Sequence, residues 1–369
     1  MTIGINLLQY KGLQGIEVFA TNLLEELISL GKNNDFVLFV TEKSKVIFNF
    51  DSFENVRYVT INPRSYTKLN LILLQQFKLP RAAKKEDIDL LFCPSLAIPL
   101  LYRKKIVTVH DCAWRRFSKE AGFISRLYLG AAMFSAKFFS LRIVTVSNFS
   151  RNEVEKLYKV NPEHITVISE GISKLPNVSS EFIGHTLDKF NLQNRNFFYF
   201  VGNFHHRKNL ICSLRAFGLF LNKHSDYLFV ISGKKGGYEF ENIRKEVQSN
   251  GIQDNVIFTD FVTDEEKVAL YISSRGLIFP SLYEGFGLPV LEAQSLNVPV
   301  LTSNGSSLNE TAGEGAVFID PLSYENIAEG MEELLIRRDS LISIGRENAG
   351  RYSWKESART LLDAIKRIM

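Results

Sequence analysis

The sequence contains little cysteine, and the cysteines that it has are far apart. Only Cys93, Cys112 and Cys212 occur among 369 residues. An odd number of widely spaced cysteines argues against a disulfide framework and against a zinc site, and it is typical of a reducing compartment. A chain of this length can remove about three quarters of its unfolded surface from water, so we expect a hydrophobic core to hold the fold without such links.

Long apolar runs are also missing. The longest mostly apolar stretch without charge, residues 90–102, contains Pro94 and Pro99 and is too short to span a bilayer. Residues 1–12 lack a basic segment followed by an apolar run, so we expect no secretory signal. No Gly-x-Gly-x-x-Gly follows the first apolar stretch, which argues against a dinucleotide-dependent dehydrogenase.

What remains is the composition of a globular protein with an uneven charge. Hydrophobic residues make up 45% of the chain and charged residues 23%, and the length fits two large domains better than one. Residues 1–190 contain 25 Lys and Arg against 18 Asp and Glu, whereas the remainder contains 19 against 22. This excess on one half indicates an anionic partner: a membrane surface, a phosphorylated ligand or nucleic acid.

Short β-rich runs alternate with helical patterns along both halves. The predicted strands are 2–8, 36–41, 56–61, 90–94, 105–110, 142–147, 165–169, 197–202, 227–232, 255–259, 276–280, 298–302 and 316–319. The predicted helices are 16–31, 69–85, 123–140, 150–159, 209–222, 239–249, 264–274, 289–296, 323–337 and 354–368. Ser150 with Glu153, and Thr263 with Glu266, each predict a capping box at a helix start.

The repeated alternation predicts an α/β fold with two doubly wound, Rossmann-like domains that face a central cleft. We place the first domain at 1–172, a linker at 173–195 and the second domain at 196–352. The last helix, within 353–369, is expected to return toward the first domain. Because ligands of open α/β sheets bind at the carboxyl ends of the strands, functional residues should directly follow strands.

The most specific stretch is residues 280–292, PSLYEGFGLPVLE, which follows a predicted strand. Gly285 and Gly287 flank Phe286 and leave the backbone open to a ligand. A helix that begins near Pro289 places its N-terminus behind this loop, which suits an anion such as a diphosphate.

Two carboxylates belong to this stretch. Glu284 precedes the turn, and Glu292 is expected in the first turn of the helix. Because a phosphate repels a carboxylate, we expect both to accept hydrogen bonds from hydroxyl groups of a sugar and a ribose. The alternative is structural: Glu292 simply lies favourably near a helix N-terminus, and the glycines simply form a turn.

These residues resemble a known family. Glu284-Gly285-Phe286-Gly287-Leu288-Pro289, followed by Glu292, is similar to the E-x7-E motif of retaining glycosyltransferases of the GT-B fold, family 4 (glycosyl transferases group 1). Residues 202–209, GNFHHRKN, resemble the glycine-x-x-x-x-Arg-Lys-Asn loop of that family. Further matching segments are 14–17, 107–111, 144–147, 307–313 and Asp320-Pro321.

The resemblance implies a site for a nucleotide diphosphate sugar, with no metal and no other cofactor. Arg207 and Lys208 would bind the diphosphate, and Glu292 would hold the ribose. Glu284 and the backbone from Gly285 through Phe286 and Gly287 to Leu288 would contact the donor sugar and phosphate. Two fixed cations stabilise the negative charge that a leaving diphosphate gains in the transition state. We expect neither Glu284 nor Lys208 in a core.

Three further residues acquire roles from the resemblance. His110, which ends a predicted strand, would lie beside the donor sugar and the acceptor, and the matching family histidine makes it a candidate catalytic residue. Gly15 and Gly202 would let the backbone approach the donor. The sequence departs from the usual family residues at Gln14, Asn203 and Ser169-Glu170-Gly171. These departures concern loop geometry, the hinge and the choice of donor.

Asp87-Ile88-Asp89 has the D-x-D form of a metal site in the other large glycosyltransferase fold. It directly precedes a predicted strand, so it belongs to the edge of the sheet opposite the carboxyl ends. We therefore interpret it as solvated acidic residues rather than as a metal site.

Residues 114–142 combine aromatic side chains with a strong excess of cations. The cations are Arg115, Arg116, Lys119, Arg126, Lys137 and Arg142, against the single acid Glu120. A basic, aromatic, amphipathic helix suits the surface of an anionic membrane. The alternative is that the aromatic rings pack this helix against the sheet. We expect membrane contact, and hence a cytoplasmic protein that is peripheral on the inner face of the plasma membrane.

The sequence thus predicts a retaining, metal-independent glycosyltransferase that acts on a glycan or lipid-linked acceptor in cell-surface polysaccharide synthesis, such as that of lipopolysaccharide. The Arg-Lys-Asn form of the loop resembles bacterial mannosyltransferases, so GDP-mannose is the preferred donor, ahead of uridine diphosphate sugars. The alternatives are a sugar-nucleotide epimerase or phosphorylase of the same fold and a catalytically silent partner subunit. Nucleic acid is not an expected partner, because no aromatic and basic stacking motif is present.

Overall fold

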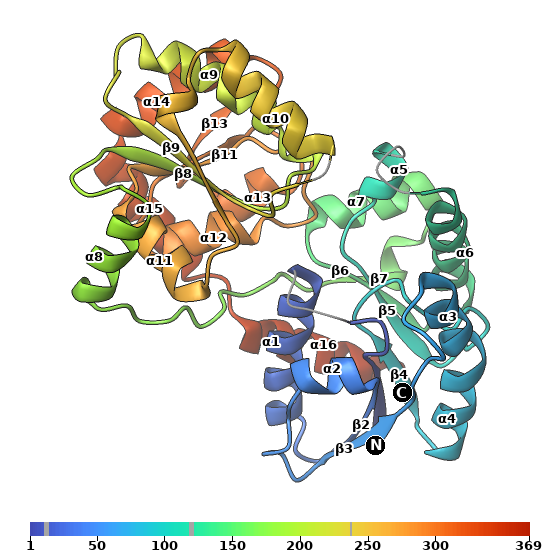
Figure 1. Ribbon diagram of the computed structural model, residues 1–369. Helices are drawn as coiled ribbons and strands as arrows, with labels where there is room; N and C mark the ends of the chain where they lie inside the picture. The colour runs from blue at the N-terminus through green and yellow to red at the C-terminus, as the bar shows by residue number, and fades with distance from the viewer. Residues whose placement is uncertain (11–14, 118–121, 237) are drawn as a thin grey trace. The chain divides into compact units, whose positions relative to one another are not determined.

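The computed structural model describes residues 1–10, 15–117, 122–236 and 238–369. Its contacts divide the chain into two units. The first unit is Met1–Gly171 together with Ser353–Met369, and the second is Ile172–Tyr352. The last helix therefore belongs to the first unit, where it lies against the first helix of the chain (Figure 1).

The first unit contains a parallel sheet of seven strands in the order β3-β2-β1-β4-β5-β6-β7. Its strands are β1 (Thr2–Asn6), β2 (Asp35–Val40), β3 (Val56–Thr60), β4 (Leu90–Cys93), β5 (Lys105–Val109), β6 (Arg142–Thr145) and β7 (Ile165–Val167). Its α-helices are α1 (Gly15–Leu30), α2 (Glu42–Ile47), α3 (Lys68–Leu73), α4 (Leu79–Lys85), α5 (Ala113–Arg116), α6 (Phe123–Phe139), α7 (Asn148–Tyr158) and α16 (Trp354–Ile368). Strands β4 and β5 are buried at every position, as in a sheet that is covered on both faces.

The second unit contains a parallel sheet of six strands in the order β10-β9-β8-β11-β12-β13. Its strands are β8 (Phe197–Val201), β9 (Leu228–Ser232), β10 (Val256–Asp260), β11 (Gly276–Phe279), β12 (Val300–Ser303) and β13 (Ala316–Ile319). Its α-helices are α8 (Ser180–Lys189), α9 (Leu210–Leu221), α10 (Tyr238–Ser249), α11 (Asp264–Ser273), α12 (Leu288–Ser295), α13 (Leu308–Ala312), α14 (Tyr324–Ile336) and α15 (Arg338–Ala349). The prediction of two doubly wound α/β domains is confirmed.

Several details differ from the prediction. The predicted helix 69–85 is interrupted by a π-helical turn at Leu74–Lys78, because Pro80 has no N–H with which to continue the hydrogen bonds of the helix. The stretch 173–195, predicted as a linker, belongs to the second unit and contains α8. Helices α2, α5, α8, α13 and α15 were not predicted, since most are too short for a clear apolar period.

One of the two predicted capping boxes is confirmed. Thr263 caps α11, and the side chain of Glu266 returns the hydrogen bond to the backbone of Thr263. The other is wrong, because the N-cap of α7 is Ser147, three residues before Ser150, and it accepts a hydrogen bond from the N–H of Ser150. Ser150 instead uses its hydroxyl to reach the carbonyl oxygen of His110 at 2.7 Å.

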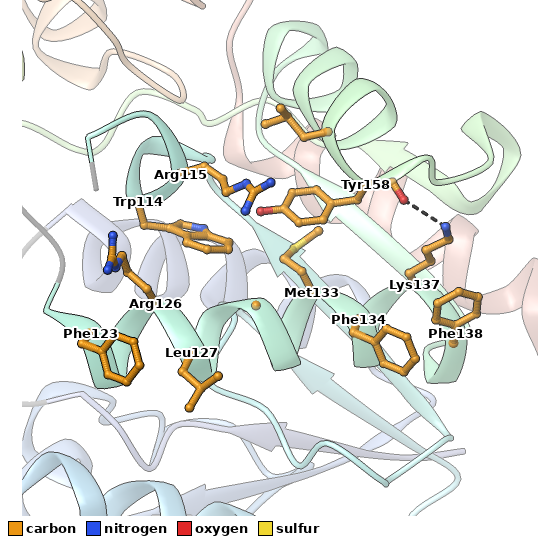
Figure 2. A pocket seen from close by; sticks show the side chains of 12 residues that line it. Trp114, Arg115, Phe123, Arg126, Leu127, Met133, Phe134, Lys137, Phe138 and Tyr158 are labelled. Carbon is orange, nitrogen blue, oxygen red and sulfur yellow. Dashed lines mark hydrogen bonds between the residues drawn. The ribbon is translucent and has the colours of Figure 1, made fainter. Parts of the chain in front are cut away.

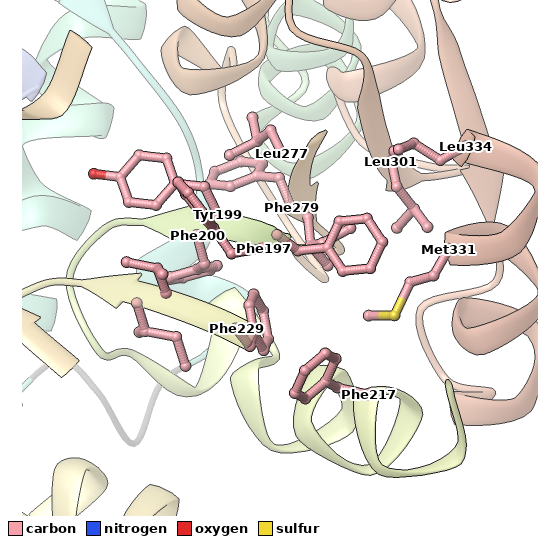
Figure 3. Packing of buried hydrophobic residues seen from close by; sticks show 14 of the residues in the cluster. Phe197, Tyr199, Phe200, Phe217, Phe229, Leu277, Phe279, Leu301, Met331 and Leu334 are labelled. Atoms are coloured by element: carbon pink, nitrogen blue, oxygen red, sulfur yellow. The ribbon is translucent and has the colours of Figure 1, made fainter. Parts of the chain in front are cut away.

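Large apolar side chains fill the core of the second unit (Figure 3). Phe217 of α9 packs against Phe229 of β9 with ring centroids 5.3 Å apart, and both are fully buried. Burying a side chain of this size contributes about 1.5–3 kcal/mol. Leu277 and Leu301 add aliphatic surface from β11 and β12, so this core holds the strands whose ends carry the predicted site.

Replacing Phe217 with alanine should therefore destabilise the second unit. We expect Phe217→Ala to lower the free energy of unfolding by about 3–5 kcal/mol, because the ring leaves a cavity that its neighbours can only partly fill. Leu219→Ala, on the exposed side of the same helix, is the matched control and should change it by about 0.5 kcal/mol or less. Calorimetric unfolding of both variants measures the difference, and equal effects would contradict this account of the core.

Candidate active site

Two loops of the second unit meet at the point where its strand order changes direction. Strand β8 is followed by residues 202–209, and its neighbour β11 is followed by residues 280–287. In a doubly wound sheet, this switch point is where the loops diverge and a ligand site forms. The sequence motifs at 202–209 and 280–292 therefore lie side by side, although about 75 residues separate them in the chain.

Backbone and amide hydrogen bonds fix these two loops to each other. The N–H of Leu282 donates to the carbonyl oxygen of Arg207 at 2.8 Å. The side-chain amide of Asn209 donates to the carbonyl oxygens of Pro280 at 3.1 Å and Pro321 at 2.6 Å. Asn209 itself has a left-handed backbone, which asparagine tolerates better than most residues. The family motif residue thus ties three loops together.

A buried ion-pair cluster of Glu284, Arg207 and Lys208 lies where the loops meet. The Nζ of Lys208 is 2.6 Å from Oε1 of Glu284, and an Nη of Arg207 is 2.8 Å from Oε2. Glu284 is 7% exposed and Lys208 8%. The expectation that neither side chain would lie in a core is therefore wrong: each was judged alone, but opposite charges compensate one another's loss of water.

The electrostatics of the cluster keep its carboxylate ionised. Burial by itself raises the pKa of Glu284, but the ammonium of Lys208 and the guanidinium of Arg207 outweigh it and lower the pKa below its usual value. Lys208 also lies 4.6 Å from the ring centroid of Phe279, the last residue of β11. One carboxylate thus holds two cations, which leaves a net positive charge at the loop junction.

The N-terminus of α12 follows the same loop. Gly287 occupies the N-cap position with a φ of 116°, a backbone conformation that favours glycine, and it supplies no capping side chain. A Cβ there would lie 2.8 Å from a methyl carbon of Leu308. The hydroxyl of Ser307 donates to the carbonyl oxygens of Glu284 and Phe286, at 2.9 and 2.7 Å. Backbone Gly285-Phe286-Gly287-Leu288 is thereby shaped to present a helix N-terminus to an anion.

The second glutamate of the motif, Glu292, lies apart from this cluster. It is in the second turn of α12 rather than the first, because the helix begins at Leu288. Its carboxylate accepts hydrogen bonds from Lys267 at 3.0 Å and from Tyr271 at 3.2 Å, both on α11. The sequence analysis did not identify Lys267 and Tyr271 as partners of Glu292. Their spacing of four residues on a predicted helix indicates a shared face, but it does not indicate that this face contacts Glu292.

In the first unit, the predicted catalytic residue His110 lies just beyond β5. The Nε2 of His110 is 2.9 Å from the carbonyl oxygen of Pro94, which can only accept, so Nε2 carries the proton. Its Nδ1 is 3.7 Å from a carboxylate oxygen of Glu170, and the ring of Phe19 lies perpendicular to it with centroids 4.7 Å apart. Glu170 had been noted only as a departure from the family pattern, and the structure makes it the neighbour of His110.

The two glycines differ in their surroundings. Gly15 is the first residue of α1, is exposed, and a Cβ there would contact nothing within 4 Å; Gln14 lies outside the described residues. Gly202 follows β8, and its carbonyl oxygen would lie 2.2 Å from a Cβ on Gly233. The structure thus brings Gly202, Arg207, Lys208 and Glu284 together in the second unit and places Glu292 beside its partners on α11, while Gly15 and His110 belong to the first unit.

The D-x-D sequence has a structural role at the predicted edge. Asp89 directly precedes β4, and its carboxylate accepts a hydrogen bond from the N–H of Thr2 at 2.8 Å. In the part of the chain that the structure describes, no group of three or more His, Cys, Asp or Glu side chains is arranged to hold a metal ion.

Described residues of α5, α6 and α7, from Trp114 to Tyr158, line an open groove of about 610 Å³ on the first unit (Figure 2). Helix α6 turns small side chains such as Ala132 and Ala136 inward and leaves Phe123 73% and Leu127 68% exposed. The packing alternative is thus wrong for these large side chains. None of the helices described is long and apolar enough to cross a membrane.

The cations of this segment have different surroundings. Arg115, Arg126 and Lys137 line the groove, and Lys137 donates to the carbonyl oxygen of Tyr158 at 3.0 Å. Arg116 forms a bidentate pair with Glu153 at 2.8 Å, and Arg142 donates to the carbonyl oxygen of Glu163. Lys119 and Glu120 lie outside the described residues. The predicted excess of cations is therefore partly compensated by neighbours that are distant in sequence.

Comparisons with known proteins agree with the motifs. The family described as Glycosyltransferase Family 4 matches residues 13–174, and Glycosyl transferases group 1 matches residues 186–355. O-antigen chain mannosyltransferase B of Escherichia coli is 28% identical over 284 residues, 74% of this chain and 73% of that protein. The serotype-specific mannosyltransferase WbdA of Escherichia coli is 27% identical over 235 residues, 62% of this chain, but the match spans only 29% of WbdA.

A solved structure shares the fold over its whole length. The Anabaena protein HepE, in complex with UDP and glucose, superposes with a TM-score of 0.77 at 14% sequence identity, covering 99% of each chain. The two family matches together include every strand except β1 and every motif of the second unit. The chain belongs to the glycosyltransferases of family 4, glycosyl transferases group 1, with the GT-B fold.

Proposed function

We propose that this glycosyltransferase transfers a sugar with retention, and without a metal, from a nucleotide diphosphate sugar to a glycan or lipid-linked acceptor in cell-surface polysaccharide synthesis. The observation that carries the proposal is the buried cluster of Glu284, Arg207 and Lys208 beside the N-terminus of α12. Its two cations and one carboxylate leave a positive charge that a diphosphate would neutralise. The relatives that bear mannosyltransferase names support a role in O-antigen or lipopolysaccharide assembly.

The cluster is suited to stabilise a leaving diphosphate. As the bond from sugar to phosphate breaks, negative charge accumulates on the diphosphate oxygens. Arg207 and Lys208 are held in place by Glu284, so they need little reorganisation when that charge develops. The first-turn amides of α12 add a partial positive charge from the same side. Glu284 keeps lone pairs with which to accept a hydrogen bond from a sugar hydroxyl.

His110 is proposed to act beside the donor sugar and the acceptor. The Pro94 carbonyl and the Glu170 carboxylate face its two ring nitrogens. These partners limit the rotation of the ring.

GDP-mannose is the proposed donor. The mannosyltransferase names of the relatives and the Arg207-Lys208-Asn209 form of the loop support it. A uridine diphosphate sugar is the alternative, and the UDP complex of HepE is the observation that favours it. Thermal-shift measurements with GDP and UDP compare the two, because a ligand at 100 times its dissociation constant adds about 2.7 kcal/mol of stability.

The groove face of α6 is proposed to contact an anionic membrane, where the protein would be peripheral on the inner face. Exposed Phe123, Leu127 and Phe134 would enter the interface, with Arg126 and Lys137 at its charged surface. Each cation near such a surface contributes about 1 kcal/mol. This placement would bring the enzyme to a lipid-linked acceptor.

Arg207 allows the sharpest test of the cluster. Arg207→Gln should lower the rate of transfer about 100-fold or more, because it removes one stabiliser of the developing charge. The fold should persist, since Glu284 keeps its pair with Lys208. Arg215→Gln, which breaks an exposed pair with Glu246, is the matched control and should transfer normally. Normal turnover by folded Arg207→Gln would contradict the site.

Metal independence is tested by chelation. With a diphosphate neutralised by Arg207, Lys208 and the α12 N-terminus, no divalent ion is required. We expect transfer to continue in excess EDTA, measured as release of nucleoside diphosphate. Loss of activity that manganese or magnesium restores would contradict the proposal.

Membrane contact is tested by sedimentation with liposomes. The protein should bind vesicles that contain anionic lipid, and high salt should weaken binding because salt screens the cations. Replacing Phe123, Leu127 and Phe134 together with serine should abolish sedimentation. The matched control replaces Phe261 and Ile336, exposed apolar residues of the second unit, and should bind normally. Failure to bind anionic vesicles at low salt would contradict the proposed membrane contact.

A further inference from the structure

The carboxylate of Glu292 is held by two donors from a neighbouring helix. Lys267 donates to Oε1 at 3.0 Å, and the hydroxyl of Tyr271 donates to Oε2 at 3.2 Å. The two donors are four residues apart on α11, so they project from one face of that helix. Each carboxylate oxygen therefore has one donor from the protein, although the single hydroxyl proton of Tyr271 is shared with the carbonyl oxygen of Pro289 at 3.3 Å.

Burial makes this arrangement rigid. Tyr271 is fully buried, and its ring packs edge-on against Tyr199 with centroids 5.1 Å apart. Lys267 is partly buried; burial by itself lowers its pKa, but Glu292 and Asp264 outweigh burial and raise the pKa above its usual value. The ammonium is therefore charged at neutral pH, and the carboxylate has a fixed cation at one oxygen.

The carboxylate still has capacity for a ligand. An ionised carboxylate offers about four lone-pair positions, and the two donors of α11 use one on each oxygen. Glu292 is only partly buried and lies on the helix whose N-terminus follows the Glu284 cluster. Two adjacent hydroxyls, such as the 2′ and 3′ hydroxyls of a ribose, match two carboxylate oxygens whose orientation is fixed.

We infer that Lys267 and Tyr271 are positioning residues, which orient the Glu292 carboxylate so that it accepts hydrogen bonds from both ribose hydroxyls of the donor nucleotide. The inference rests on the proposed function, which supplies the nucleotide. A purely structural pair would join α11 to α12 and stabilise the protein without affecting which nucleotide it binds. Discrimination between ribose and deoxyribose therefore separates the two roles.

The experiment measures the affinity of the full chain for a nucleoside diphosphate and for its 2′-deoxy and 3′-deoxy forms by calorimetry. GDP and UDP are both titrated, and the series is built on the tighter of the two. Wild-type protein should bind the ribonucleotide about tenfold or more tightly than either deoxy form, because a hydrogen bond to a charged group is lost. In Lys267→Met, affinity for the ribonucleotide should fall about tenfold and the ribo-to-deoxy ratio should approach one. Lys267→Arg should restore most of the ratio.

A matched control and a second variant complete the test. Lys189→Met removes an ammonium that pairs with Glu266, another carboxylate of α11, and should leave the ratio unchanged. Tyr271→Phe removes only a hydroxyl and should also lower the ribo-to-deoxy affinity ratio. This variant tests the positioning role if Lys267→Met does not fold.

The outcomes separate the inference from the proposed function. Wild-type binding without discrimination, or an unchanged ratio in both folded variants, overturns the positioning role while nucleotide binding stands. Failure of wild-type protein to bind either GDP or UDP overturns the proposed function itself.

Discussion

One carboxylate, that of Glu284, pairs with both Arg207 and Lys208 and so joins the loops that follow β8 and β11. Opposite charges placed in a buried position are stable only when their geometry is close and their remaining hydrogen bonds are satisfied. Both distances, 2.6 and 2.8 Å, meet that requirement. The backbone around the cluster is in turn held by Asn209 and Ser307, which donate to carbonyl oxygens of the loops. The conformation of the whole loop junction depends on this one compensation of charge.

The same constraint explains why a hydrophobic core and a polar site can adjoin so closely. Phe279, the last residue of β11, is fully buried, yet Lys208 lies over its ring at 4.6 Å. An ammonium can occupy that place because Glu284 accompanies it and the face of the ring attracts cations. The aromatic core of the second unit thus packs against the charged cluster through the ring of Phe279. It also keeps water away from it, which strengthens every charge interaction there.

Much of the fold could be predicted because local sequence decides local structure. Continuously apolar strands and the Thr263 capping box need only a few neighbouring residues to form, and both were predicted correctly. The start of α7 was predicted wrongly because Ser147 and Ser150 are equally good caps by composition. The choice between them depends on tertiary contacts, since Ser150 bonds to the carbonyl of His110, 40 residues earlier. The interruption of the 69–85 helix had a visible cause in Pro80, but only the structure gives the form of the interruption.

The sequence by itself determined the two-domain α/β architecture and the two motifs at 202–209 and 280–292, because periodicity and motif spacing are local properties of the chain. Only the tertiary structure decided which side chains meet: Glu284 with both cations, Glu292 with Lys267 and Tyr271, and His110 with Glu170. It also decided that α6 buries Ala132, Met133 and Ala136 and leaves Phe123, Phe134 and Phe138 exposed, against the ordinary preference for burying large rings. These pairings depend on how helices pack on the sheet, and the distance between two residues in space is not encoded in their separation along the chain.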